Sequence, residues 1–93
     1  MASIRDLKKT VDYLAGAVVT DCINYAIYAR KHDEEVSRLV EEIVSFRNDA
    51  RARVADGKSV EKKERRAFYR AIASDMLAKT DECFAKLSEL VKQ

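Results

Sequence analysis

The stretch LAGAVVTDCINYAIYA, Leu14 to Ala29, is the most apolar part of this 93-residue chain, and its interpretation decides the fold. A membrane-spanning helix needs about 20 predominantly apolar residues with few or no charges. The longest uninterrupted candidate, 13–19, is far shorter, and Asp12 and Asp21 flank it. Because a carboxylate near the middle of a bilayer is costly, the stretch predicts a buried helix of a protein core and no membrane contact.

Apolar residues extend this stretch at steps of three and four, the spacing that keeps one face of an α-helix buried. The positions that follow this spacing are Ile4, Leu7, Val11, Leu14, Val18, Asp21, Tyr25 and Tyr28. We therefore predict a first helix over 3–31. Asp33 is a favoured residue at a helix start, and Glu34 and Glu35 suit the positive end of a helix dipole. A second helix is predicted over 34–55.

The segment ADGKS, 55–59, predicts the end of the second helix and the start of a third. Gly57 suits the left-handed residue that ends many helices, and Ser59 suits the cap of the next one. The chain has no proline and is rich in strong helix formers. A third helix is predicted over 60–92, and the fold is an all-α, up-down-up antiparallel three-helix bundle forming one domain over 1–93.

The third predicted helix is the longest, which affects what covers its end. If it folds back directly from Gly57 beside the second helix, Glu82 becomes level with Glu34. The apolar residues beyond this point are then expected to project past the second helix with only the first helix beside them. These residues are Phe84, Leu87, Leu90 and Val91.

The first helix carries apolar residues on two faces. Ile23 and Ile27 lie four residues apart on the side opposite the predicted seam, beside the small residues Gly16 and Thr20. A glycine inside a helix costs about 1 kcal/mol relative to alanine, so close approach of another helix would explain Gly16. With the projecting end of the third helix, this face predicts self-association as a two-fold dimer. The alternative is a monomer whose first helix is buried on more sides.

Asp21 occupies a position of the buried series although it is charged. One interpretation is a boundary carboxylate that bonds to a basic or tyrosine side chain or points into solvent, since buried carboxylates are costly unless paired. The other is a small polar cleft lined by Asp21, Asn24, Tyr25 and Tyr28. No basic residue or histidine lies near them in the first helix, so no reaction is assigned.

The sequence shows no catalytic or metal-binding constellation. His32 is the only histidine and lies between the first two helices, which excludes an ordinary multi-histidine metal site. Cys22 and Cys83 lie on apolar faces and are expected to be reduced core thiols, a disulfide or redox pair being the alternative. Glycine-rich phosphate loops are absent. We expect no cofactor and no enzyme activity.

The opening IRDLKKTVDYL, 4–14, is similar to the start of the all-helical chorismate mutases, which are short three-helix dimers. That resemblance implies basic side chains projecting from helix interiors to hold two substrate carboxylates. The first helix has no basic residue between Lys9 and Arg30. The resemblance therefore lacks the basic side chains that would bind the substrate, and this enzyme class is only a remote alternative.

Charge is segregated along the chain. Residues 47–70 hold nine basic and four acidic side chains, a net charge of +5, whereas the rest of the chain carries −3. The predicted fold brings Arg5, Lys8 and Lys9 beside this basic end. The side chains expected to face a partner there are Lys62, Lys63, Arg65, Arg66 and Arg70. An acidic protein surface is the expected partner, and nucleic acid, with stacking on Phe68 or Tyr69, is the alternative.

The segments IRDLKK, DYL, DC and FRNDARARV, all within the first 55 residues, resemble small all-helical proteins of Bacteroides-type bacteria. The resemblance implies a helical bacterial protein of unassigned function and gives no residue a catalytic role. The charged opening MASIRDLKK has no apolar segment typical of a secretory signal, so a cytoplasmic location is expected. The function predicted from the sequence is a non-catalytic, self-associating helical binding or structural module.

Overall fold

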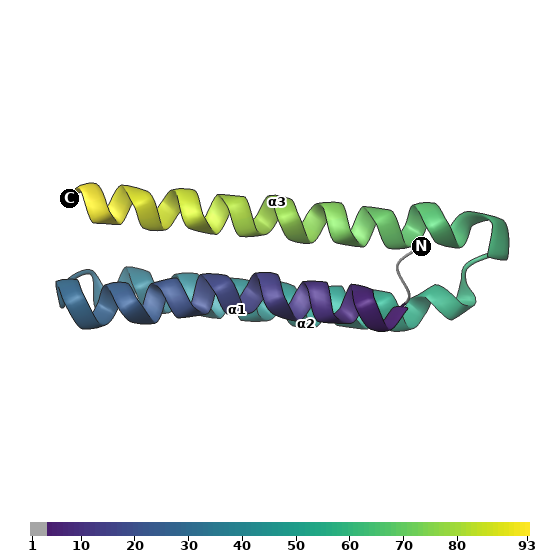
Figure 1. Cartoon of the computed structure of the whole chain (residues 1–93), viewed down its shortest axis with the longest axis horizontal. Coiled ribbons are helices and arrows are strands. Elements are labelled where there is room, and N and C mark those ends of the chain that lie inside the picture. The colour runs from purple at the N-terminus through teal and green to yellow at the C-terminus, as the bar shows by residue number, and fades with distance from the viewer. Residues whose placement is uncertain (1–3) are drawn as a thin grey trace.

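The computed structural model describes residues 4–93, which form three α-helices and two short 3₁₀ turns (Figure 1). The helices are α1, Ile4–Ala29, α2, Asp33–Asp56, and α3, Arg65–Lys92. The turns η1, Gly57–Ser59, and η2, Lys62–Glu64, connect α2 to α3. The prediction of an all-α chain with three helices is confirmed over these residues. The predicted helix start at Ser3 lies outside them.

The three helices pack into a rod of 49 × 19 × 16 Å. The chain reverses direction at both connections, so α1 and α2 lie side by side and α3 runs back along them (Figure 1). At one end of the rod, Lys31 Nζ donates a hydrogen bond of 2.9 Å to the Gln93 carbonyl. The α1–α2 turn therefore lies at the same end as the C-terminus, and the α2–α3 connection lies at the other end.

Each helix contributes one stripe of buried apolar side chains to a common core, as residues spaced three and four apart must on a helix. Fully burying such a side chain contributes about 1.5–3 kcal/mol, so this core is the main stabilising element of a short chain. The largest side chains without exposed surface are Val11, Val18, Cys22, Ile43, Val54, Ile72, Met76 and Cys83.

Both helix boundaries predicted from capping residues need correction. Gly57 is right-handed, with φ −58°, and the left-handed residues are Arg30, φ 51°, and His32, φ 60°. His32 occupies the position before α2, so Asp33 lies inside the helix. Ser59 belongs to η1, well before α3 begins. Gly57 is needed for a different reason, because a Cβ there would overlap the ring and hydroxyl of Tyr69.

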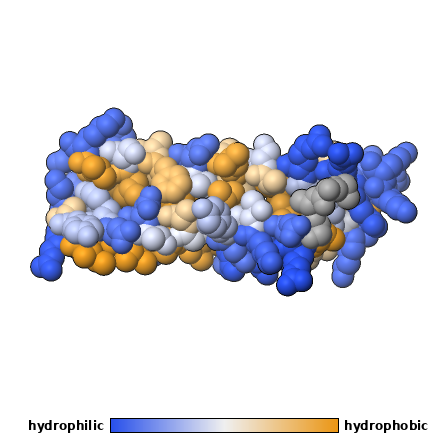
Figure 2. Space-filling view, in the orientation of Figure 1, coloured by the Kyte–Doolittle hydropathy of each residue, from blue (hydrophilic) through white to orange (hydrophobic). Residues whose placement is uncertain are grey.

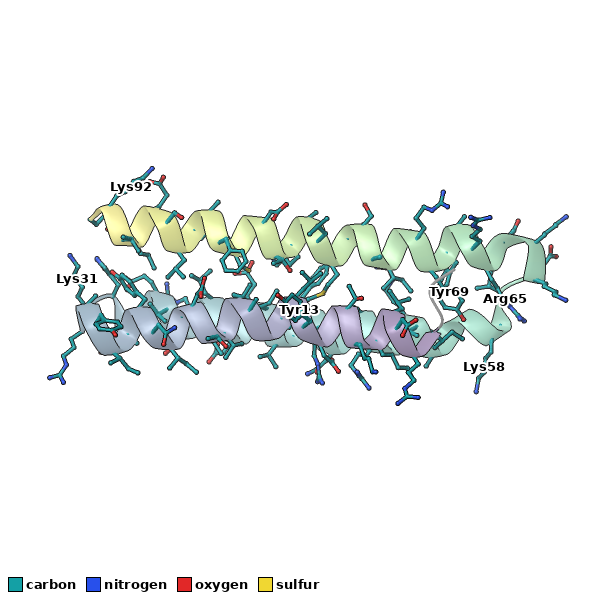
Figure 3. All side chains as sticks on the ribbon, viewed as in Figure 1. Tyr13, Lys31, Lys58, Arg65, Tyr69 and Lys92 are labelled. Atoms are coloured by element: carbon teal, nitrogen blue, oxygen red, sulfur yellow. The ribbon has the colours of Figure 1, made fainter. Side chains whose placement is uncertain are left out.

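The register of α3 also differs from the prediction, because residues 57–64 form a compact connection and α3 begins at Arg65, five residues after the predicted start at residue 60. Arg65 stabilises this connection by donating from Nε to the Val60 carbonyl at 3.0 Å and from Nη2 to the Lys58 carbonyl at 3.2 Å. Figure 3 shows Arg65, Lys58 and Tyr69 gathered at this end of the rod. The connection delays the start of α3 relative to α2.

The later start removes the predicted projection of α3 past α2. Glu42, and not Glu34, lies level with Glu82, since Lys79 and Lys86 both form ion pairs with Glu42 and with Glu82. The end of α3 is consequently packed against the bundle.

No helix within residues 4–93 combines the length and the apolar character that crossing a membrane requires.

The two glycines predict opposite responses to alanine. Nothing lies within 4 Å of a Cβ at Gly16, so Gly16→Ala is expected to raise the free energy of unfolding by about 0.5–1 kcal/mol through helix propensity. Gly57→Ala must displace Tyr69 and is expected to lower the free energy of unfolding by about 1 kcal/mol or more. Chemical denaturation of both variants measures these changes. Equal effects of the two substitutions would contradict the packing described for Gly57.

Candidate functional site

The outer α1 face consists of Gly16, Thr20, Ile23 and Ile27, and all four residues are exposed. Ile23 is 52% exposed and Ile27 is 60% exposed. The open space around Gly16 shows that neither α2 nor α3 approaches this side of α1. The structure thus brings together the four α1 residues predicted for self-association and leaves them uncovered within the described chain.

The apolar surface continues from α1 onto α2. Asp12 pairs with Arg47 at 2.9 Å and with Arg51 at 2.7 Å, which identifies the sides of α1 and α2 that meet. On α2, Val44 and Val40 precede Arg47 by three and seven residues and so share its side of the helix. Val44 is exposed and Val40 is half-buried. The contact between α1 and α2 therefore has two halves. The half nearer the α2–α3 connection holds ion pairs, and the half nearer the α1–α2 turn is apolar.

The rest of the rod surface is also divided into a more apolar half and a more polar half. In Figure 2, orange surface gathers on the half that holds the α1–α2 turn and the C-terminus, and blue surface dominates the half that holds the α2–α3 connection. The four-residue spacing of Val40 and Val44 is the signal that places them on one exposed edge.

The α3 residues predicted for self-association lie elsewhere. Leu87 is only 6% exposed and belongs to the core, so it offers little surface to a second copy. Phe84 and Leu90 are half-buried against the core, and the Leu90 carbonyl accepts a hydrogen bond of 3.2 Å from Tyr25. Val91 alone of the four is well exposed. These residues face α1 on its α3 side and do not extend the outer α1 face.

An open groove of about 520 Å³ separates α1 from the end of α3. Its lining residues are Asp21, Asn24, Tyr25, Phe84, Leu87, Ser88, Val91 and Lys92. Three members of the predicted polar cleft, Asp21, Asn24 and Tyr25, are among them, but Tyr28 is exposed outside it. Within residues 4–93, no group of three or more His, Cys, Asp or Glu side chains is arranged to hold a metal ion.

Cys22 and Cys83 are both buried and free. Burial raises the pKa of the Cys22 thiol above its ordinary value, and the nearby Cys83 and Asp21 raise it further. Burial likewise raises the pKa of Cys83, followed by the charge of Glu42. Because the thiolate is the reactive form, both side chains are poor nucleophiles in the folded chain.

The basic end separates into exposed and structural side chains. Lys62, Arg66 and Arg70 are exposed and have no ion-pair partner within the described residues. Lys63 lies 3.9 Å from Glu61. Arg65 is half-buried and donates hydrogen bonds to two carbonyls of the α2–α3 connection, so it also stabilises the fold.

The two aromatic residues of this end are not free stacking platforms. Phe68 and Tyr69 are half-buried and pack edge to face, with ring centroids 5.7 Å apart. The ring of Tyr69 also fills the space over Gly57. The basic end can therefore offer charge to a partner, whereas these two half-buried rings offer little surface for stacking.

A second basic group lies at the start of α1. The N-terminal groove, about 390 Å³ in volume, is lined by Ile4, Arg5, Lys8, Lys9, Asp12 and Arg51. Burial would raise the pKa of Asp12, but hydrogen bonds from Arg47 and Arg51 outweigh it and hold the pKa below its ordinary value. Arg5, Lys8 and Lys9 have no acidic partner among residues 4–93. The groove therefore presents uncompensated positive charge.

Comparisons with protein-family models, curated proteins and solved structures find no match to this chain. Its assignment consequently depends on the geometry of these surfaces.

The ion-pair network between α2 and α3 predicts a pH-dependent stability. Hydrogen bonds from Lys79 and then Lys86 hold the pKa of Glu42 below its ordinary value of 4.5. A carboxyl whose pKa is lower in the folded chain than in the unfolded chain stabilises the fold at a pH above the unfolded pKa. This stabilisation is lost as the pH falls through the folded pKa. Glu42→Gln is expected to lower the free energy of unfolding by about 1 kcal/mol at pH 7.

Denaturation of Glu42→Gln and wild type from pH 7 to pH 3 measures the effect, and the difference should shrink below about pH 4.5. Glu41→Gln is the matched control, since Glu41 is exposed and has no partner in the described chain. A pH-independent difference for Glu42→Gln would show that the pairs with Lys79 and Lys86 do not stabilise the fold.

Proposed function

We propose that this chain is a non-catalytic helical module that pairs with a second copy of itself through the outer α1 face and binds an acidic protein through its basic end. The observation that carries the first part is the exposure of Ile23 and Ile27 on a face that no other part of the described chain covers. Exposed apolar residues that form a contiguous patch commonly mark an interaction site, whereas scattered ones do not.

The energetics favour burial of this face. A chain of this length buries a smaller fraction of its surface than a larger domain does, so an added interface contributes a large share of its stability. Each Å² of apolar surface removed from water contributes about 25 cal/mol.

The second part of the proposal is supported by the open charge at the basic end. Lys62, Arg66 and Arg70 lie on the α2–α3 connection and the first turns of α3, away from the outer α1 face. A second copy on α1 would leave them accessible. An acidic protein is favoured over nucleic acid because the neighbouring aromatic rings are half-buried against the core and offer little surface for stacking.

Charge placed on the outer α1 face should separate the two copies. Ile23→Glu/Ile27→Glu is expected to give a monomer at concentrations where the wild type is a dimer, because two carboxylates would have to be desolvated. Both positions are exposed, so the thermal unfolding midpoint measured on the monomer should change little. Sedimentation equilibrium from 5 to 200 µM (about the range in which weak dimers form) measures the mass.

Leu77→Glu is the matched control. Leu77 is an apolar α3 residue of comparable exposure, 51%, and lies outside the α1–α2 seam. It should leave the dimer intact. A wild-type monomer throughout the concentration range would refute self-association, and dissociation by Leu77→Glu alone would move the interface to another face.

The basic end predicts salt-dependent binding to acidic chains. Fluorescence anisotropy with labelled poly-glutamate should show binding at low salt that weakens with added salt, and Arg66→Glu/Arg70→Glu should weaken it at least tenfold. Arg38→Glu/Lys92→Glu makes the same change in net charge at the opposite rod end and should have a smaller effect. Binding of single-stranded oligonucleotides without binding of poly-glutamate would favour the nucleic-acid alternative.

A further inference from the structure

We propose that the N-terminal groove is a binding site for two adjacent phosphate groups, supplied by free diphosphate or by a small diphosphate ester. This ligand site goes beyond the pairing of two copies and the binding of an acidic protein, and it depends on neither. The observation behind it is a groove between two helices in which positive side chains outnumber the one carboxylate.

Four of the six residues that line the N-terminal groove are cationic. They are Arg5, Lys8 and Lys9 of α1 and Arg51 of α2. Like charges three or four residues apart on a helix destabilise it by about 0.2–0.5 kcal/mol per pair. The spacings of Arg5 to Lys8 and of Arg5 to Lys9 are of this kind. An anion bound among these side chains would relieve their repulsion.

The carboxylate of the groove, Asp12, does not neutralise these cations. Arg47 and Arg51 donate to its two oxygens at 2.9 and 2.7 Å, so two guanidinium groups share one negative charge. Asp6, the carboxylate nearest in sequence, is not among the lining residues. Arg51 uses its Nη1 for Asp12, and its other N–H groups can donate to a ligand. A guanidinium group suits the paired oxygens of a phosphate.

Cations at the middle of the rod are treated differently by the fold. Lys79 and Lys86 each form ion pairs with Glu42 and with Glu82, so their charge is balanced within the chain. The N-terminal groove has no such balance among residues 4–93. Its open charge is thus a local property of the groove, and an external anion can supply what the chain does not.

The size and charge of the groove favour adjacent phosphates over a single carboxylate. Its volume of about 390 Å³ lies within the range of about 300–1,000 Å³ that small-molecule sites occupy. A terminal phosphate carries a charge of about −1.5 to −2 at pH 7 and three acceptor oxygens, so two phosphates can engage several cations at once. Lys8 and Arg51 are half-buried, and partial exclusion of water strengthens their attraction for an anion.

The groove is separate from the two surfaces of the proposed function. None of its lining residues in the described chain comes from α3, whereas Arg66 and Arg70 belong to the first turns of that helix. The groove lies at the start of α1, whereas Ile23 and Ile27 lie in its second half. Variants of one surface can therefore serve as controls for another.

Isothermal titration calorimetry of the full chain with inorganic pyrophosphate tests the site. At low salt we expect a dissociation constant below about 1 mM, and binding of orthophosphate about tenfold weaker because it engages fewer cations. Adenosine diphosphate is the second probe and distinguishes the two sources. Binding of both probes indicates that the diphosphate group of an ester suffices, and binding of pyrophosphate alone indicates a site for free diphosphate.

Arg5→Gln/Lys9→Gln should weaken pyrophosphate binding about tenfold or more, because two cations of the groove are lost. Both side chains are exposed, so the thermal unfolding midpoint should change little. Arg66→Gln/Arg70→Gln is the matched control, since it makes the same change in net charge outside the groove, and it should leave pyrophosphate binding within about twofold of wild type. Absence of pyrophosphate binding, equal losses in the two double variants, or tighter binding of a single-stranded oligonucleotide than of pyrophosphate overturns the diphosphate site. Each of these outcomes leaves the proposed self-association untouched.

Discussion

The contact between Tyr69 and Gly57 is the constraint on which much of the structure depends. It holds residues 57–64 as a compact connection, and Arg65 fixes that connection through the carbonyls of Lys58 and Val60. Because α3 begins only after it, Lys79 and Lys86 come level with Glu42, and Leu87 is buried. The register set at one end of the rod thus decides what is covered at the other.

Once α3 is placed, the exposed surfaces follow. Its end packs on the α3 side of α1, so the opposite side of α1 remains uncovered and carries Ile23 and Ile27. The ion pairs of Asp12 close the basic half of the α1–α2 seam, and valines line the apolar half. The exposed apolar surface and the separation of charge therefore have one structural origin. The first half of α1 forms ion pairs with α2, whereas the second half carries exposed apolar side chains.

Helical periodicity predicts the three helices, the core stripe and the outer α1 face from the sequence, because each depends on spacing within a single helix. Cap residues predict the connections poorly. Gly57 suggests a left-handed turn, whereas its absent side chain serves Tyr69, a contact between residues twelve positions apart. Register between helices has no local signal, so the sequence predicts neither the burial of Leu87 nor the hydrogen bonds by which Arg65 stabilises the α2–α3 connection.

An odd number of helices also determines where the chain enters and leaves the rod. α1 begins at the end with the α2–α3 connection, and α3 finishes at the end with the α1–α2 turn (Figure 1). Anything joined before Ile4 and anything joined after Lys92 would be held apart by most of the 49 Å length of the rod. The bundle is thus a stiff spacer as well as a surface, in contrast to an even-numbered helical hairpin, which brings its two attachments together.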